Sequence, residues 1–233
     1  ALVLWRNARR SKQQNQLLEK MNSTLSHKND EVQTLLREIH HRVKNNLQIV
    51  SSLWRLQARG LNDKGAQDAL RISQSRVQSI ALLHQRLYQG QELKNIPIRP
   101  YIEELTLSLA DAYRLEEHQI NIHTDVEDFS IDVDLAMPIG LILTELIINA
   151  IKHAFVDGRK GEIRLSLQKN GADFRLLVAD NGLGLKLSGG KPVHRMNSFG
   201  LELVESLAQK LDARLVFSNG QGTSAELIVP VLQ

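Results

Sequence analysis

Glu145-Leu146-Ile147-Ile148-Asn149-Ala150-Ile151-Lys152-His153 is the stretch that decides the fold. It places three polar groups at regular intervals within a strongly apolar segment whose composition predicts a helix with one buried side. Glu145, Asn149 and Lys152 are four and three residues apart, so they share one face of that helix. A carboxylate, an amide and an ammonium group on one face can hold a hydrated divalent cation with its phosphates, because Mg²⁺ takes oxygen ligands and keeps several waters. A solvated polar stripe is the alternative for these three residues alone.

Three further motifs downstream have the chemistry of a nucleotide site. Asp180-Asn181-Gly182-Leu183-Gly184 follows a predicted strand, and its carboxylate can accept a hydrogen bond from an exocyclic amine such as that of adenine. Ser198-Phe199-Gly200-Leu201 opens a helix, and the N–H groups at a helix N-terminus attract phosphate. Gly222-Thr223 precedes the last strand and can add a hydroxyl near the base. Each motif alone also fits ordinary turn chemistry, but their order along one chain indicates a nucleotide site.

Helices and short strands alternate around these motifs. The pattern predicts helices over residues 101–115, 134–155 and 199–211, with Asp134 as a candidate N-cap of the second. It predicts strands over residues 119–123 and 130–133, and hairpins of 163–168 with 174–179 and of 214–218 with 224–229. Asn170-Gly171 forms the turn of the first hairpin. This order predicts an α/β sandwich, in which helices cover one face of a mixed sheet.

The first part of the chain predicts a long helical hairpin. Residues 7–59 contain neither proline nor glycine, and their apolar residues recur at steps of mostly three or four, typical of one amphipathic helix. Gly60 to Gly65 interrupts this pattern, and a second helix follows to about Gly90. The first helix far exceeds the average length of ~11 residues and needs a partner to cover its apolar stripe. We therefore expect a homodimer in which two hairpins form a four-helix bundle.

Glu38-Ile39-His40-His41-Arg42-Val43-Lys44-Asn45-Asn46 is an unusually polar stretch within the first helix. At about 100° per residue, His40 lies roughly 40° from the apolar stripe and His41 roughly 140° from it. A nucleophilic imidazole must reach a phosphoryl donor, so the outward His41 is the better candidate acceptor and His40 the candidate bundle residue. Asn45 lies one turn after His41 on the same face, and Glu38, one turn earlier, is a candidate to orient or deprotonate the imidazole. Arg42 and Lys44 either neutralise phosphate or form a solvated face.

The downstream motifs resemble the N, G1 and G2 boxes and the final Gly-Thr of the GHKL-type ATP-binding fold of sensor histidine kinases. The resemblance implies that Asn149 binds Mg²⁺, that Asp180 recognises adenine with support from Thr223, and that Lys152 and His153 lie near the phosphates or ribose. Gly182, Gly184 and Gly200 then shape the lid and its hinges, and Ser198 and Leu201 belong to the G2 box. Glu145 is a catalytic candidate on the Asn149 face. The lid between Gly184 and Ser198 is short and departs from the family pattern, because it contains no phenylalanine of an F box.

The stretch from Leu36 to Gln48 resembles the histidine box of the HisKA_2 histidine kinases, relatives of the HWE group, and the resemblance covers residues 31–233. Arg42 departs from the larger histidine kinase class, which has an acid directly after the histidine. The resemblance implies an ATP- and Mg²⁺-dependent protein histidine kinase of a two-component system, which passes its phosphoryl group to an aspartate of a response-regulator receiver domain. Another GHKL ATPase and a non-catalytic dimeric scaffold are the alternatives.

This assignment divides the chain into three parts. Residues 1–30 form a signalling helix or membrane-proximal linker, 31–92 the dimerisation and phosphotransfer hairpin, and 97–233 the ATP-binding domain. Ala1-Leu2-Val3-Leu4-Trp5 followed by basic residues is typical of the cytoplasmic boundary of a membrane helix, although a frayed helix start or a tag remnant has the same pattern. We therefore expect a cytoplasmic domain of a membrane-anchored protein, with a membrane or sensor segment upstream.

Composition bounds these expectations. Of 233 residues, 42% are apolar and 4% aromatic, so the core is mostly aliphatic. A net charge of +3 and the lack of a dense basic block beyond residues 6–12 argue against nucleic-acid binding. The chain contains no cysteine, which excludes a disulfide framework and a thiolate metal site.

Overall fold

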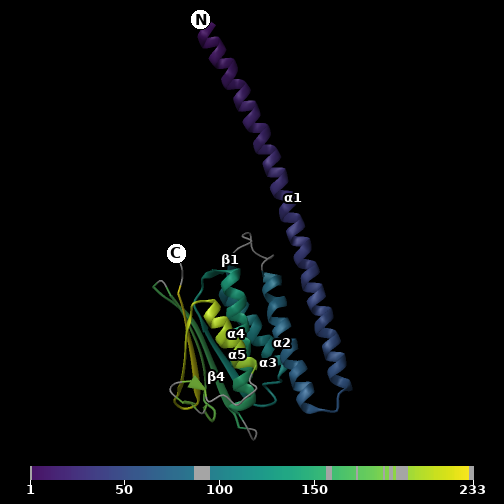
Figure 1. Cartoon of the computed structure of the whole chain (residues 1–233), viewed down its shortest axis with the longest axis vertical. Helices are drawn as coiled ribbons and strands as arrows, with labels where there is room; N and C mark the ends of the chain where they lie inside the picture. Colours follow the sequence, from purple (N-terminus) through teal and green to yellow (C-terminus); the bar gives the residue numbers. More distant parts are fainter. Residues whose placement is uncertain are drawn as a thin grey trace. The chain divides into compact units, whose positions relative to one another are not determined.

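The computed structural model describes residues 2–86, 95–155, 159–171, 173–185, 187–188, 191–192 and 199–230. The side chains of several residues of the first helix, His40 and His41 among them, lie outside the described set. The chain forms two compact units, Ala1–Val43 and Lys44–Gln233. Figure 1 shows the course of the chain through both units.

The first helix, α1 (Leu2–Gly60), runs without interruption for 59 residues, as the lack of proline and glycine predicts. Its stripe is exposed along most of its length: Leu17 is 59% exposed, Leu25 68% and Ile39 52%. Helix α2 (Lys64–Arg86) begins after a turn in which the carboxylate of Asp63 accepts from the N–H groups of Gly65 and Ala66 at 3.1 Å. The predicted end of this helix near Gly90 lies outside the described residues.

The sheet is mixed, as the sequence predicts, and its five strands are in the order β2-β4-β5-β9-β8, which the sequence did not predict. Its strands are β2 (Ile120–Val126), β4 (Gly161–Asn170), β5 (Asp173–Asp180), β8 (Arg214–Asn219) and β9 (Thr223–Pro230). Strand β2 pairs with β4 in parallel, and the other neighbours are antiparallel. Two small antiparallel pairs accompany it: β1 (Asn95–Pro97) with β3 (Ser130–Asp132), and β6 (Leu187–Ser188) with β7 (Lys191–Pro192). The sequence indicated a strand near β3 but did not predict β1, β6 or β7.

Three helices cover one face of this sheet: α3 (Ile98–Ala112), α4 (Val133–His153) and α5 (Phe199–Lys210). Helix α4 is the central element of the core, with Ile139, Ile142 and Leu143 fully buried. Its length and apolar composition would also suit a membrane span, but most of it is buried inside the domain. The N-cap prediction was wrong by two residues, because Asp132 is the cap and its side chain accepts from the N–H of Asp134 at 2.8 Å. The last residue of β3 therefore caps the helix.

Helix α2 packs against α3 and α4 and belongs to the core of the second unit. Its Leu82 and Leu83 are buried in the same apolar cluster as α4. The hydroxyl oxygen of Tyr101 in α3 lies 3.2 Å from that of Ser79 in α2, and burial raises the pKa of Tyr101 to about 12, so the phenol is neutral. A Cβ on Gly140 of α4 would lie 1.9 Å from the same Tyr101 oxygen. The three helices therefore meet with no spare volume at this point.

Candidate active site

Asp180 ends strand β5 with its carboxylate held by two backbone amides. Its Oδ1 accepts from the N–H of Gly182 at 2.9 Å and from the N–H of Thr223 at 3.1 Å. Gly182 belongs to the turn after β5 and Thr223 begins β9, so the two hydrogen bonds join both ends of the motif pair that the sequence singled out. Oδ2 has no hydrogen bond among the described residues and is available to a donor such as an exocyclic amine. Thr223 thus supports Asp180 through its backbone.

Two glycines in these turns are required by close packing. A Cβ on Gly182 would lie 2.4 Å from the Cβ and the carbonyl oxygen of Ala154, at the end of α4. A Cβ on Gly222 would lie 2.1 Å from the carbonyl oxygen of Asp180 and 2.6 Å from its Oδ1. Gly184 instead has a φ of +77°, a conformation that side chains rarely adopt. The turns can therefore approach α4 and Asp180 only as glycine.

Gly222→Ala is expected to weaken nucleotide binding by at least about tenfold, because the methyl group displaces the Asp180 carboxylate from its two amides. Titration with a fluorescent adenine nucleotide measures the change in Kd. Gly220→Ala is the matched control in the same turn, since its Cβ would meet nothing within 4 Å, and its Kd should stay within about twofold of the original. Equal affinities of the two variants would contradict this account of the turn.

Asn219, which sequence reasoning missed as a site residue, connects the β8–β9 hairpin to the backbone that follows β5. Its Oδ1 accepts from the N–H of Leu185 at 3.2 Å, and its Nδ2 donates to the Leu185 carbonyl at 2.5 Å. Because the amide uses both its acceptor and its donor on one residue, it holds the backbone directly after Gly184. In the sequence, Asn219-Gly220 reads as a common turn pair, and this pattern does not indicate that the Asn219 amide also binds a residue outside its own turn.

Glu145, Asn149 and Lys152 share one face of α4, as predicted, and the start of α5 lies close to that face. A Cβ on Gly200 would lie 2.6 Å from Oε2 of Glu145 and 3.9 Å from Oδ1 of Asn149. The structure thus brings the face of α4 that carries Glu145 and Asn149 next to Gly200 of the Ser198-Phe199-Gly200-Leu201 motif. Leu201 packs partly buried against the core, while Ser198 lies outside the described residues. His153 is exposed at the last turn of α4.

Both charged members of this stripe are paired with helix α2. Glu145 is only 2% exposed, and its oxygens accept from Nε of Arg76 at 2.6 Å and from Nη2 at 2.9 Å. Lys152 Nζ lies 3.9 Å from Oδ2 of Asp68. Sequence reasoning missed Arg76 and Asp68. The sequence nevertheless contained a signal for Arg76. It lies four residues from both Ile72 and Ile80, so it shares their apolar face of the helix, and a charged side chain on a buried face needs a partner of opposite charge.

The predicted acceptor segment lies in α1, and its geometry is described in part. The side chains of His40 and His41 lie outside the described set, so their predicted difference in orientation stays a prediction. Asn45 is exposed, consistent with an outward face. Glu38 accepts a hydrogen bond from Nε of Arg42 at 2.8 Å, and both side chains are well exposed. Such a surface pair contributes less than about 1 kcal/mol to stability, so Glu38 can leave Arg42 to accept a hydrogen bond or a proton from an imidazole.

The residues present suit a magnesium ion carried by a nucleotide. Among the described residues no group of three or more His, Asp or Glu side chains is placed to hold a metal. Asn149 can supply one amide oxygen, which suits Mg²⁺ because this ion retains waters and takes phosphate oxygens as further ligands. The Glu145 carboxylate is engaged by Arg76 in this arrangement. Metal binding here would therefore depend on the phosphates.

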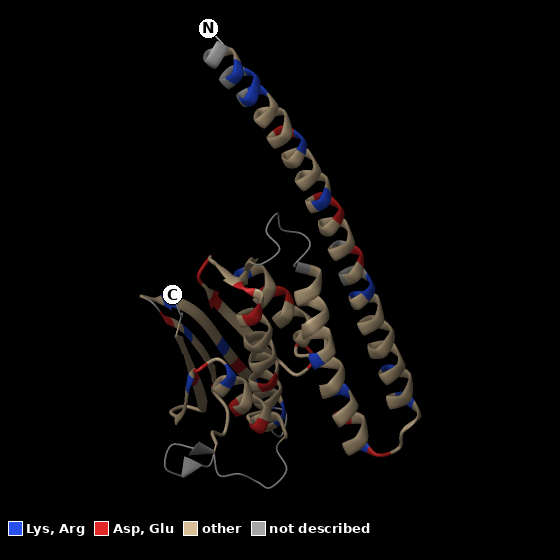
Figure 2. Cartoon of the chain, turned by 45° about the horizontal axis from the view of Figure 1, so that its top comes forward, with Lys and Arg blue, Asp and Glu red and all other residues tan. Residues whose placement is uncertain are grey.

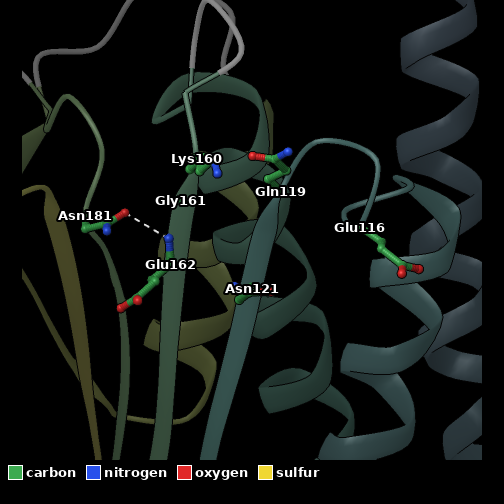
Figure 3. Close-up of a pocket in the computed structure, with 7 residues that line it drawn as sticks. All are labelled: Glu116, Gln119, Asn121, Lys160, Gly161, Glu162 and Asn181. Carbon is green, nitrogen blue, oxygen red and sulfur yellow. Dashed lines mark hydrogen bonds between the residues drawn. The ribbon is translucent and has the colours of Figure 1, made fainter.

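A separate pocket of about 470 Å³ lies at the start of strands β2 and β4 (Figure 3). Its charged lining residues are Glu116, Lys160 and Glu162, and the backbone N–H of Glu162 donates to Oδ1 of Asn181 at 2.9 Å. Of the nucleotide motifs that the sequence analysis quoted, only Asn181 lines this pocket, and no nucleotide role was assigned to it. The mixed charge of its lining favours no single class of ligand.

Two family models match this chain. One, described as a histidine kinase, covers residues 38–113, and the other, described as a histidine kinase-like ATPase domain, covers residues 108–228. The first therefore covers the His40–His41 segment and the second covers every predicted nucleotide motif.

Individual proteins agree with these models. Sensor histidine kinase PdtaS of Mycobacterium tuberculosis is 34% identical over 200 residues, which are 84% of this chain and 39% of that protein. Blue-light-activated histidine kinase 2 of Erythrobacter litoralis is 30% identical over 210 residues, covering 87% of this chain and 59% of that protein. A solved histidine kinase domain from a blue-light-activated kinase of Erythrobacter litoralis superimposes with a TM-score of 0.62 at 27% identity, covering 84% of this chain and 90% of that chain. The matched part of the chain therefore spans only 39% and 59% of the lengths of these two curated relatives.

Proposed function

Because this chain belongs to the histidine kinase family, we propose that it is the kinase core of a two-component sensor. It binds Mg-ATP on the α4 side of the sheet, transfers the γ-phosphoryl group to His41, and passes it to an aspartate in the receiver domain of a response regulator. The proposed organisation is a signalling helix over residues 1–30, a dimerisation and phosphotransfer hairpin over 31–92, and an ATP-binding domain over 97–233.

One observation carries the nucleotide half of this proposal. Asp180 is fixed by the amides of Gly182 and Thr223 with Oδ2 left for a ligand, and α4 presents Asn149 within reach of the start of α5. A carboxylate held in this way accepts from an exocyclic amine, as the 6-amino group of adenine requires. The proposal assigns Asn149, Lys152 and His153, at the end of α4, to the phosphates and ribose, and assigns Gly184 and Gly200 to the two hinges of a lid.

The acceptor half rests on the chemistry of an imidazole next to a base. A ring nitrogen of His41 forms the new N–P bond while the bond from the γ-phosphorus to the bridging oxygen breaks and ADP leaves. Glu38 takes the imidazole proton or orients the ring, and Asn45 positions a water for dephosphorylation from one turn away. Arg42 neutralises phosphate charge once it leaves Glu38.

Mg²⁺ would be held by Asn149 and the phosphate oxygens, and when bound it neutralises phosphate charge. Glu145 stands one turn before Asn149 on the same face of α4 and has a catalytic role when its carboxylate is free. In the arrangement described here, its charge is balanced by Arg76.

The exposed stripe of α1 supports a homodimer through the helical hairpin. Met21 is 61% exposed and Val32 51%, and both lie on the stripe with Leu17, Leu25 and Ile39. A contiguous apolar stripe of this length is covered in solution by another helix, and a second copy offers the same stripe. Light scattering of the chain should give twice the monomer mass, and a monomer mass at micromolar concentration would contradict the dimer.

The N-terminal end of α1 supports a position near a membrane. Arg6, Arg9 and Arg10 are concentrated in this part of the helix, where much of the ribbon is blue in Figure 2, and the guanidinium of Arg9 lies 5.4 Å from the centroid of the exposed Trp5 ring. Tryptophan beside arginine is typical of the boundary between membrane and cytoplasm. The proposed location is therefore cytoplasmic, next to a membrane or sensor segment in the full-length protein.

Incubation with γ-³²P-ATP and Mg²⁺ tests the proposed function. A histidine kinase gains label that is lost in acid and retained in alkali, because a phosphoramidate has this stability. A separate ATPase would release phosphate without labelling the protein, and a scaffold would not bind nucleotide at all. Either result would replace the proposal.

A further inference from the structure

Helix α2 meets the predicted phosphate face of α4 through a buried ion pair. Arg76 binds Glu145 with two parallel hydrogen bonds, at 2.6 and 2.9 Å, and the side chains are 20% and 2% exposed. This two-point geometry is the strong form of a guanidinium–carboxylate contact. Because Glu145 is almost completely buried, loss of Arg76 would leave a buried charge without its partner, so the pair links α2 firmly to α4.

The same arginine also contacts the beginning of α5, where the lid segment ends. Its Cζ lies 4.8 Å from the centroid of the Phe199 ring, and a Cβ on the next residue, Gly200, would lie 2.6 Å from Oε2 of Glu145. A guanidinium over an aromatic ring is attracted to its face. Arg76 therefore connects three elements: its own helix, the Glu145 stripe and the hinge of the lid.

A second pair of opposite polarity follows along the same two helices. Lys152 of α4 lies 3.9 Å from Asp68 of α2, two turns before Arg76. Glu145 and Lys152 are likewise two turns apart on α4, so the two antiparallel helices match charge for charge. Asn149 lies between Glu145 and Lys152 on this stripe. Helix α2 thus engages both charged side chains that flank the predicted magnesium ligand.

The geometry points to α2 as a charge-matched lock on the nucleotide site. In the locked arrangement Arg76 occupies both carboxylate oxygens of Glu145, which withholds them from a metal ion, and the Asp68 carboxylate balances part of the Lys152 charge, which weakens its attraction for a phosphate. Mg-nucleotide binding and the docking of α2 then compete for the same groups, and each weakens the other by the same factor, as linkage requires. This inference rests on the proposed function, because it takes the α4 stripe to be the phosphate site.

The lock gives the helical hairpin control over the catalytic domain. A movement of α2 along or about its axis separates Arg76 from Glu145 and Phe199 together, which frees the carboxylate and the lid hinge in one step. Because Leu83 of α2 is fully buried in a close-packed core, α2 shifts as one rigid helix and not residue by residue. A signal carried along α1 into the hairpin therefore has a defined target in the active site.

Arg76→Gln tests the lock, with the Kd for a fluorescent adenine nucleotide measured once with Mg²⁺ and once with EDTA. Release of Glu145 is expected to strengthen Mg-nucleotide binding about tenfold, the usual scale of a coupling between sites, and to leave EDTA binding no tighter. Arg76→Lys keeps the charge but loses the two-point geometry and should fall between. Asp68→Asn breaks the weaker pair and should strengthen binding about two- to threefold.

Arg71→Gln is the matched control, since it removes the same charge from the same helix where the guanidinium lies 5.8 Å from the Tyr113 ring. Its Kd should equal that of the original chain. The lock is overturned if Arg76→Gln binds Mg-nucleotide equally or more weakly, with Arg71→Gln unchanged. If Arg76→Gln does not fold, Asp68→Asn decides. The lock is then overturned if Asp68→Asn does not bind Mg-nucleotide more tightly than the original chain.

A second measurement separates failure of the lock from failure of the proposed function. The chain contains no cysteine, so Ala69→Cys in α2 and Gln209→Cys in α5 accept spin labels at two sites only. Arg76→Gln should broaden the distance distribution between these labels without nucleotide, and Mg-nucleotide should broaden it in the original chain. An unchanged distribution in Arg76→Gln refutes the lock, whereas absence of nucleotide binding in every chain refutes the proposed function.

Discussion

Replacement of His41 by glutamine is expected to abolish phosphorylation of the chain by ATP. Glutamine retains good helix propensity and a polar terminus but has no ring nitrogen able to form the N–P bond. Helix α1 runs unbroken through this position, so replacement by another good helix former leaves the helix intact. The measurement is acid-labile ³²P incorporation from γ-labelled ATP, and the expected result is a fall to background.

His40→Gln is the matched control, because it makes the same chemical change at the neighbouring position. Helical phase predicts that residue 40 faces the apolar stripe, so this variant should retain most of the label. Both variants should bind nucleotide with the original Kd, because the binding motifs lie in residues 145–223. Full labelling of His41→Gln together with loss of label in His40→Gln would reverse the assignment of the two histidines.

Asp180→Asn is expected to weaken adenine nucleotide binding about 100-fold, or about 3 kcal/mol. The amide oxygen can still accept from the N–H groups of Gly182 and Thr223, so the turns keep their structure. The remaining position of the carboxylate is then occupied by an NH₂ group, which faces the amine of adenine donor against donor. The substitution therefore removes recognition while preserving the scaffold around it.

Nucleotide titration and thermal unfolding together measure this effect. Asp173→Asn is the control, since it makes the same substitution at the opposite end of β5 and should change neither the Kd nor the Tm. Unchanged affinity in Asp180→Asn would show that the base is recognised elsewhere. A large fall in Tm would show instead that Asp180 acts mainly by holding its two turns together.

Much of the ATP-binding domain was predictable because its signals are local. Three predictions depended only on neighbouring residues, and all were confirmed. They are the helical spacing of apolar residues in α4, the turn at Asn170-Gly171, and the alternation of apolar and polar residues in β4 and β5. The cap of α4 was misplaced by two residues because both Asp132 and Asp134 have suitable side chains. The choice depended on where β3 ends, which its pairing with β1 determines.

The contacts around Asp180 and Asn219 were predictable only in kind. The sequence indicated a carboxylate in a glycine-rich turn, but the donors to it come from Gly182 beside it and from Thr223 on another strand. Likewise, the sequence predicted a hairpin of 214–218 with 224–229, but the contact of Asn219 with Leu185 requires this hairpin to lie next to the residues that follow β5. Strand order in the sheet brings these groups together, and local pattern does not encode that order.

The amino-acid sequence by itself determined which side chains are the candidates for the chemistry: an imidazole pair on a helix, a polar stripe on an apolar helix, and a carboxylate between glycines. Each follows from the spacing of neighbouring residues, because helix and turn geometry repeat over a few positions. Only the tertiary structure decided that Glu145 is paired with Arg76 and Lys152 with Asp68. These partners lie far apart in the chain and meet because Leu82 and Leu83 bury α2 against the catalytic core. Burial of apolar surface selects that packing, and the charges pair where it places them.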